Sequence, residues 1–257
     1  KPKLQFVSRV PGISDLYPIK PASEFKFSWI KSVMTQYKQA KELVPYPNHV
    51  GRCPGIFDLL KIGYIVPIPF DLLMIIRPDA ETIFRWEVSN ESLLSALGNE
   101  VVQLHLPIGD HRPPGFLEQV IKINSPWRVI APKGVQLIVN PIPYPDIHFF
   151  RGVAGLWDVS NSPQLNIQMW FTDQPGEYLI KAGTPMMHII PLTDKKLDPV
   201  VRDATDNDYR WLEKESFATN HSFDPANIKK TTQILFDKIT KLEQKVVDYN
   251  MHVQVLV

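Results

Sequence analysis

The chain has 257 residues, of which 44% are hydrophobic and 21% are charged, a composition that permits a buried core and excludes wholesale disorder. Its 28 basic and 27 acidic residues give a net charge of +1, so no strong overall field draws the chain to nucleic acid or to a membrane surface. Cys53 is the only cysteine, which excludes an intramolecular disulfide and a Cys-rich zinc site and favours a reducing, cytoplasmic location. We expect its side chain to be a small buried thiol.

Two elements are predicted before residue 48. Lys3–Ser8 alternates between polar and apolar residues, which predicts a short strand. Phe27–Val44 has apolar residues at helical spacing and is followed by Pro45, which predicts an amphipathic helix that ends there. The apolar face of this helix consists of Ile30, Val33, Met34, Tyr37 and Ala40.

From Lys61 to Leu192 the hydrophobic period becomes two, as it does in strands with one buried face. The candidate strands are Lys61–Val66, Phe70–Arg77, Glu81–Val88, Glu100–Leu106, Glu118–Asn124, Trp127–Ala131, Gly134–Ile142, Gln164–Thr172, Glu177–Ile180 and Met186–Pro191. The alternation is clearest in Gln164–Thr172. The face of this strand that we expect to be buried consists of Leu165, Ile167, Met169 and Phe171. Trp170 lies on the opposite, polar face, so we expect it to be exposed at an interface or ligand groove.

The pattern predicts a mainly β fold: an antiparallel sandwich, a jelly roll or an irregular barrel, with a helix near the N-terminus and a long helix at the C-terminus. We divide the chain into an N-terminal strand and helix (1–47), a β-rich core domain (48–195) and a C-terminal helical appendage (196–257). The longest apolar run, Ile65–Ile76, is shorter than the ~20 residues of a spanning helix and fits buried strands, so we expect no membrane span.

The C-terminal appendage has two helix signals. Thr205–Asp208 is a capping sequence for a short helix, and Asp224 with Pro225 marks the start of a long one. The long helix has a heptad-like seam formed by Ile228, Leu235, Ile239, Leu242, Val246 and Tyr249. Such a seam must pack on another surface, either the helix Phe27–Val44 of the same chain or the same helix of a second copy. We therefore expect a protein partner or self-association through the C-terminal helix.

A polar cluster lies between two predicted strands, where loops commonly carry binding residues. It contains His105, Asp110, His111 and Arg112, and these are candidate ligand-binding residues. Chemical motifs such as a phosphate-binding glycine loop or a nucleophile elbow are missing from the sequence. No catalytic residue is therefore assigned, and whether the chain is an enzyme stays open.

A metal site is the alternative interpretation of the histidines. The segment Lys181–His188 resembles the second metal-ligand motif of the cupin superfamily, in which a Gly-x-Pro turn precedes a histidine on a strand. The resemblance implies an iron or zinc site built from His105 or His111, Glu118 and His188. The first cupin motif, with two histidines one residue apart, is absent. We therefore expect no metal cofactor, and we expect His188 to be a hydrogen-bonded strand histidine.

Aromatic residues are a third set of candidates. Trp127 stands beside Arg128, so an indole and a guanidinium could together stack on a base or a sugar. Because aromatic residues in strands usually belong to the core and no basic stripe accompanies them, we do not expect nucleic acid as a partner. The ligand-binding candidates at this level are Trp127, Arg128 and Trp170.

Three stretches of the sequence carry a resemblance to a known family. They are Cys53-Pro54-Gly55 leading into Gly63–Pro67, the segment Val135–Pro145, and Asn166–Phe171 followed by Pro175-Gly176-Glu177 and Gly183-Thr184-Pro185. Their order is similar to that in an uncharacterised protein family of tailed bacteriophages, notably T4-like phages of marine hosts. The resemblance implies a viral origin, a β-rich core over about residues 45–195, and action in the host cytoplasm. It implies no catalytic residue.

Three functional hypotheses follow. The first is a phage-type β-sandwich protein that acts by binding or assembly rather than by catalysis. The alternative is a jelly-roll non-haem metal enzyme, an oxygenase or hydrolase, that uses the four candidate metal ligands. The third is a metal-free β-barrel that binds a small molecule or a nucleotide.

Overall fold

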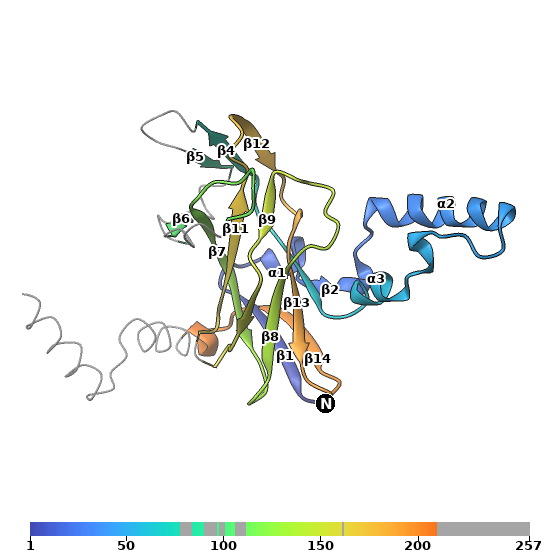
Figure 1. Cartoon of the computed structure of the whole chain (residues 1–257). Helices are drawn as coiled ribbons and strands as arrows, with labels where there is room; N and C mark the ends of the chain where they lie inside the picture. Colours follow the sequence, from blue (N-terminus) through green and yellow to red (C-terminus); the bar gives the residue numbers. More distant parts are fainter. Residues whose placement is uncertain (78–83, 90–96, 98–100, 106–111, 161, 210–257) are drawn as a thin grey trace, which may run out of the picture. The chain divides into compact units, whose positions relative to one another are not determined.

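The computed structural model in Figure 1 describes residues 1–77, 84–89, 97, 101–105, 112–160 and 162–209. The chain divides into two compact units, Lys1–Thr205 and Asp206–Val257. In the second unit, residues 206–209 are helical, where the capping sequence predicts a helix to begin. The predicted long C-terminal helix and its seam lie outside the described residues.

The described part of the first unit is built mainly of strands, which form three sheets. The first sheet has the order β14 (Asp198–Asp203), β1 (Lys3–Ser8), β7 (Val120–Ile130), β11 (Gln164–Phe171) and β9 (Phe150–Gly152), and β6 (Val102–His105) also pairs with β7. The second has the order β10 (Gly155–Trp157), β8 (Gln136–Pro141), β13 (Pro185–Leu192), β3 (Tyr64–Pro67) and β2 (Lys20–Pro21). The third contains β12 (Gly176–Ile180), β4 (Leu72–Ile76) and β5 (Phe84–Val88).

The prediction of a mainly β protein with a helix near the N-terminus is confirmed. The strand pairs are antiparallel except β1 and β14, which run parallel. The described sheets do not close into a barrel, because each ends in edge strands, such as β9 in the first sheet and β10 in the second. The predicted domain divisions after residues 47 and 195 do not coincide with the division of contacts, because β1 and β14 are neighbours in one sheet.

Two predicted strands, Glu118–Asn124 and Trp127–Ala131, are one continuous strand, β7. Pro126 between them donates no backbone hydrogen bond, but its carbonyl accepts one from the backbone N–H of Arg9, at 2.9 Å. The pairing of β7 with β11 shifts register at this point, so the strand accommodates the proline with a bulge. A proline at a bulge therefore does not end the strand.

One hydrophobic cluster joins all three sheets. The first sheet contributes Phe6 and Ile121, the second contributes Leu137, and the third contributes Met74, each with at most 1% of its surface exposed. The predicted inner face of β11 also belongs to this cluster, so that prediction is confirmed. Burial of this apolar surface is the main stabilising contribution to the fold.

Two neighbouring connections join the second and third sheets, because β3 continues into β4 and β12 continues into β13. The chain bends at both connections. Between β3 and β4, the backbone N–H of Ile68 donates to Thr184 at 3.0 Å, and the carbonyl of Ile68 accepts from Gly183 at 2.8 Å. The Asp71 carboxylate accepts a hydrogen bond from the backbone N–H of Ala182 at 2.7 Å. The Gly-Thr-Pro segment that resembles a cupin motif therefore forms the bend between two sheets.

The helix predicted over Phe27–Val44 is α2 (Ser28–Leu43), whose first turn packs with Trp29 and Ile30 on a small buried cluster. None of its residues is fully buried. Its Tyr37 stacks on His49, with ring centroids 5.7 Å apart, beside the short turn η2 (Val50–Arg52). Gly51 permits this contact, because a Cβ at that position would lie 2.7 Å from the Tyr37 Cβ. None of the helices in the described ranges is both long and apolar enough to cross a membrane.

The prediction of a buried Cys53 is wrong. This cysteine is exposed and directly precedes the helix α3 (Pro54–Leu59). Pro54 occupies the first turn of α3, where a missing N–H costs nothing. The residues after Cys53 were expected to lead into a strand, but the helix intervenes, so the cysteine is not part of the β core.

Candidate functional site

A pocket in the described residues lies where β11 loses its neighbour strand. β9 pairs with β11 only at Met169–Phe171, and the last bond joins the Val153 N–H to the Gln168 carbonyl at 2.9 Å. The chain then diverges into β10, which pairs with β8. The start of β11 therefore has no strand beside it on this edge among the described residues. We call the place where the chain leaves β11 and crosses to β8 the fork. It contains a pocket of about 230 Å³, the fork pocket.

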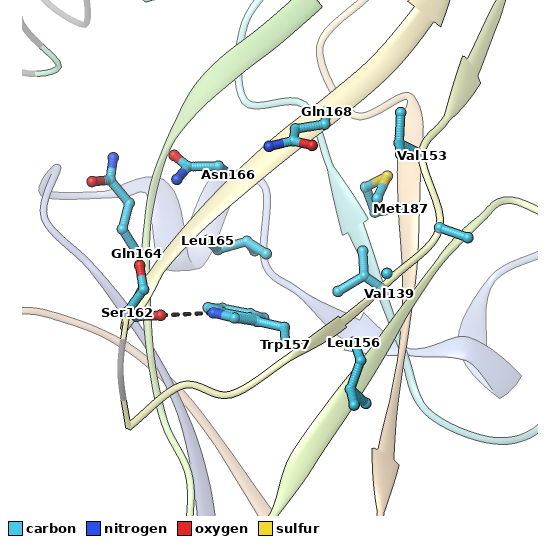
Figure 2. Close-up of a pocket in the computed structure, with 12 residues that line it drawn as sticks. Val139, Val153, Leu156, Trp157, Ser162, Gln164, Leu165, Asn166, Gln168 and Met187 are labelled. Carbon is cyan, nitrogen blue, oxygen red and sulfur yellow. Dashed lines mark hydrogen bonds between the residues drawn. The ribbon is translucent and has the colours of Figure 1, made fainter. Parts of the chain in front are cut away.

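One wall of the fork pocket is a row of three amides. Gln164, Asn166 and Gln168 line it at alternate positions of β11. Because side chains two residues apart on a strand lie on one side, about 7 Å from each other, the row spans most of the strand. Figure 2 shows these amides along β11, with Trp157 and Leu156 on the side of the strand to which Leu165 points.

The opposite wall is held by the indole of Trp157. This residue ends β10, and its Nε1–H donates to the Ser162 carbonyl at 2.6 Å (Figure 2). The turn between them is organised by the Asp158 carboxylate, which accepts hydrogen bonds from the hydroxyl of Ser160 at 2.6 Å and from its backbone N–H at 3.0 Å. These two bonds also lower the pKa of Asp158. The indole is therefore held in one orientation by its bond to Ser162 and by the ordered turn that connects the two residues.

The floor of the fork pocket is apolar. Leu165 and Met187, each 1% exposed, belong to the main hydrophobic cluster, and Val139 packs beside them. None of the residues that line the pocket carries a charge. A floor that belongs to the packed core is a rigid surface against which a ligand could rest.

Asn166 is the most informative residue of the fork pocket. Its Oδ1 is buried and has no hydrogen-bond partner. Buried polar atoms in proteins almost always have partners, and an acceptor without one costs about 1–3 kcal/mol. This oxygen is therefore a covered polar atom, in a residue that lines the pocket, for which the described residues supply no donor.

The aromatic and basic candidates lie elsewhere. Trp127 is fully buried in the main cluster, and the neighbouring Arg128 is 5% exposed, so neither can stack on a ligand from solvent. Trp170 is 6% exposed, and the expectation that it is an exposed interface residue is wrong. Alternation identifies the face of β11 on which Trp170 lies but does not show whether that face is covered.

The predicted polar cluster is not brought together around the fork pocket. His105 is half-buried at the end of β6, where it pairs with Val120. Arg112 is exposed, and its guanidinium donates to the Phe116 carbonyl at 2.6 Å. Asp110 and His111 lie outside the described residues, so their part of the prediction has no outcome.

His188 is a strand histidine, as predicted, but only half of its ring is hydrogen-bonded. It is fully buried in β13, and its Nε2–H donates to the Ile62 carbonyl at 2.7 Å. A carbonyl can only accept, so Nδ1 is the unprotonated nitrogen, and it has no partner. Burial lowers the pKa of His188, although the bond to Ile62 opposes this effect.

The proposed metal ligands belong to different sheets. His105 is in the first sheet and His188 in the second, and Glu118 is exposed just before β7. Within the described ranges, no three histidine, cysteine, aspartate or glutamate side chains form a group that could hold a metal ion. His111 lies outside those ranges, so the metal hypothesis stays a prediction.

The residues of the fork pocket were not among the sequence candidates. A signal was nevertheless present, because amides occupy alternate positions on the polar face of the clearest predicted strand. Trp157 gave no such signal, since β10 has only three residues and shows no period. A comparison of the whole chain with protein-family models, curated proteins and solved structures finds no match.

Proposed function

We propose that this chain is a binding protein rather than an enzyme, with a sandwich-type β fold, and that the fork pocket is where it recognises a small uncharged ligand. The observation that carries the proposal is the buried, unpartnered Oδ1 of Asn166 in a pocket. A protein interior retains such an atom at a cost in stability, and a ligand removes that cost when the Asn166 side chain turns so that its oxygen, which is covered in the free protein, meets a donor of the ligand.

The composition of the pocket supports binding of a neutral molecule. Pockets for small molecules are mostly apolar with a few convergent polar groups, and the fork pocket has this character. Its polar groups are amides and a backbone carbonyl, which can orient a ligand by hydrogen bonds. An ionised ligand would lose its hydration there without gaining an opposite charge.

The biological setting is proposed from the phage resemblance alone. It places the chain in the cytoplasm of an infected host, in a structural or accessory role. A protein partner or self-association through the C-terminal helix is compatible with that role. The metal-enzyme hypothesis is the alternative, and elemental analysis of purified protein for iron and zinc distinguishes the two.

Two glycines provide a test of the fork pocket. Gly155 lines it, and a Cβ there would meet nothing within 4 Å, so Gly155→Leu places a bulky side chain at the wall without a backbone clash. A Cβ on Gly55 in α3 would also meet nothing within 4 Å, and Gly55 does not line the pocket, so Gly55→Leu is the matched control.

The assay is ¹⁵N–¹H correlation NMR of the full chain with four probes: methyl β-glucopyranoside, uridine, N-acetylglycinamide and uridine monophosphate. We expect at least one uncharged probe to shift the Trp157 indole and Asn166 amide resonances in the wild type and in Gly55→Leu. We expect no such shift in Gly155→Leu. The proposal fails if no uncharged probe shifts these resonances, or if Gly155→Leu responds as the wild type does.

A further inference from the structure

We infer that the ligand of the fork pocket is a neutral pyranose ring, either a free sugar or one residue of a saccharide. This inference rests on the proposed function, because it names the chemical class of the molecule that the pocket holds. It follows from the size of the pocket, its lack of charge, the spacing of its amides and the position of Trp157.

The size of the pocket fits a single ring. Its volume of about 230 Å³ lies below the ~300–1,000 Å³ typical of pockets for drug-sized ligands. Its floor of Leu165, Val139 and Met187 is closed, so the ligand enters from the open side and rests on apolar atoms. A dinucleotide or a fused-ring cofactor is too large for this space.

The lack of charge excludes phosphorylated and acidic ligands. Nucleotides and sugar phosphates are normally bound by Arg, Lys or helix N-termini, which pair with the phosphate. The fork pocket is lined by no charged side chain, and its polar lining is formed by amides, a hydroxyl and backbone groups. The ligand therefore carries hydroxyl or amide groups rather than ionised ones.

The spacing of the amides favours hydroxyls around a ring. Gln164, Asn166 and Gln168 present donors and acceptors at three places along β11, about 7 Å apart. A nucleobase concentrates its hydrogen bonds on one edge, which a single amide can satisfy. A pyranose has hydroxyls on several sides of its ring, and each of them can both donate and accept, so it can engage more than one amide.

Trp157 offers the apolar surface that such a ring needs. Its indole lines the pocket on the side of β11 to which Leu165 points, and it is held by the bond from Nε1–H to the Ser162 carbonyl (Figure 2). The face of an indole carries a partial negative charge, and the C–H groups on one side of a pyranose carry a weak positive charge, so the two surfaces pack together. A hydroxyl on the other side of the ring would donate to the Asn166 Oδ1, which is covered and lacks a partner in the free protein, once this side chain turns toward the pocket.

The test is a titration of the wild-type chain with methyl β-glucopyranoside, methyl β-galactopyranoside, sorbitol, uridine and N-acetylglycinamide. Binding is followed by NMR shifts and by isothermal titration calorimetry. We expect at least one pyranoside to bind and to shift the Trp157 and Asn166 resonances. We expect the acyclic sorbitol to bind at least about tenfold more weakly, because its hydroxyls are not held in one arrangement.

Two variants locate the bound ring. Asn166→Leu removes the acceptor at similar volume and should weaken pyranoside binding by about tenfold, the effect of one good hydrogen bond. Trp157→Ala should abolish binding, and Trp157→Phe, which keeps an aromatic face, should restore part of it. Gly55→Leu should bind as the wild type does. Each variant is first shown to be folded by its NMR spectrum, and Asn166→Leu carries the test if Trp157→Ala does not fold.

The possible failures are distinguishable. If uridine or N-acetylglycinamide shifts the pocket resonances and neither pyranoside does, the sugar assignment is wrong while the proposed function stands. If none of the uncharged probes shifts them, both are wrong. If a pyranoside binds to Asn166→Leu and to Trp157→Ala as tightly as to the wild type, its site is elsewhere and the inference is overturned.

Discussion

Replacing His188 by leucine tests whether this buried histidine stabilises the fold or weakens it. The wild-type ring has one hydrogen bond, from Nε2–H to the Ile62 carbonyl, and one buried nitrogen without a partner. Losing the bond leaves the Ile62 carbonyl without its donor, which costs about 1–3 kcal/mol, and removing the unpartnered nitrogen returns a similar amount. Leucine is close to histidine in volume. We therefore expect the free energy of unfolding of His188→Leu at pH 8 to be at most about 2 kcal/mol below that of the wild type, or to exceed it.

His188→Ala is the contrasting variant. It removes the same polar atoms but leaves a cavity beside β3 and β8, the strands that pair with β13 at this residue. Cavities left in packed cores cost about 2–5 kcal/mol. The free energy of unfolding is measured with guanidinium chloride at pH 8. It should be similar in the wild type and the leucine variant, and clearly lower in the alanine variant.

The pH dependence gives a second, independent readout. Burial lowers the pKa of His188 in the folded state, so the unfolded chain binds a proton more readily. Wild-type stability should therefore be complete above about pH 6.5 and decrease as the pH falls below it. The leucine variant has no histidine at this position and does not lose stability in this way. Its stability relative to the wild type should therefore rise as the pH is lowered from 8 to 5. A difference that stays constant over this range, or a leucine variant as unstable as the alanine variant, would refute the reasoning.

Two further predictions concern single positions in the fold. Gly63→Ala should cost at least about 2 kcal/mol, because Gly63 has a φ of 72° and a Cβ would collide with the backbone of β13; Gly115→Ala, with a φ of 82° but open space, should cost only about 1 kcal/mol. Equal losses in chemical denaturation would show that the collision is relieved. The carboxylate of Asp203 accepts hydrogen bonds from the backbone N–H groups of Gly12 and Ser14, so Asp203→Ala should lower the free energy of unfolding by about 1–3 kcal/mol. An unchanged denaturation midpoint in that variant would mean that water replaces both bonds.

The sequence predicted those parts of the fold in which local pattern and tertiary packing agree. Alternation in β11 identified its buried face, because that face packs on the main cluster along the whole strand. The same alternation placed Trp170 on the polar face, and the structure buries it. Whether a second surface covers a polar face depends on distant parts of the chain, and local periodicity carries no information about them.

The fork pocket could be predicted only in part. Its amide row is visible in the sequence of β11, but its existence depends on where β9 stops pairing and the chain crosses to β8. Both β9 and β10 have three residues, too few to show a period. The departure of one strand from another is a tertiary event, so the sequence shows the polar residues but not the space between the walls.

The parallel pairing of β1 with β14 has a consequence for synthesis. β1 begins at Lys3, and its partner begins at Asp198, so one edge of β1 cannot be covered until almost all of the first unit has left the ribosome. At the usual ~5–20 residues per second, that interval lasts on the order of 10–40 s. During this time β1 can pair with β7 as soon as that strand emerges, and its other edge offers unpaired backbone groups to any nascent chain nearby. A chaperone that binds extended segments would thus act on the growing chain up to the moment when β14 docks, and not afterwards.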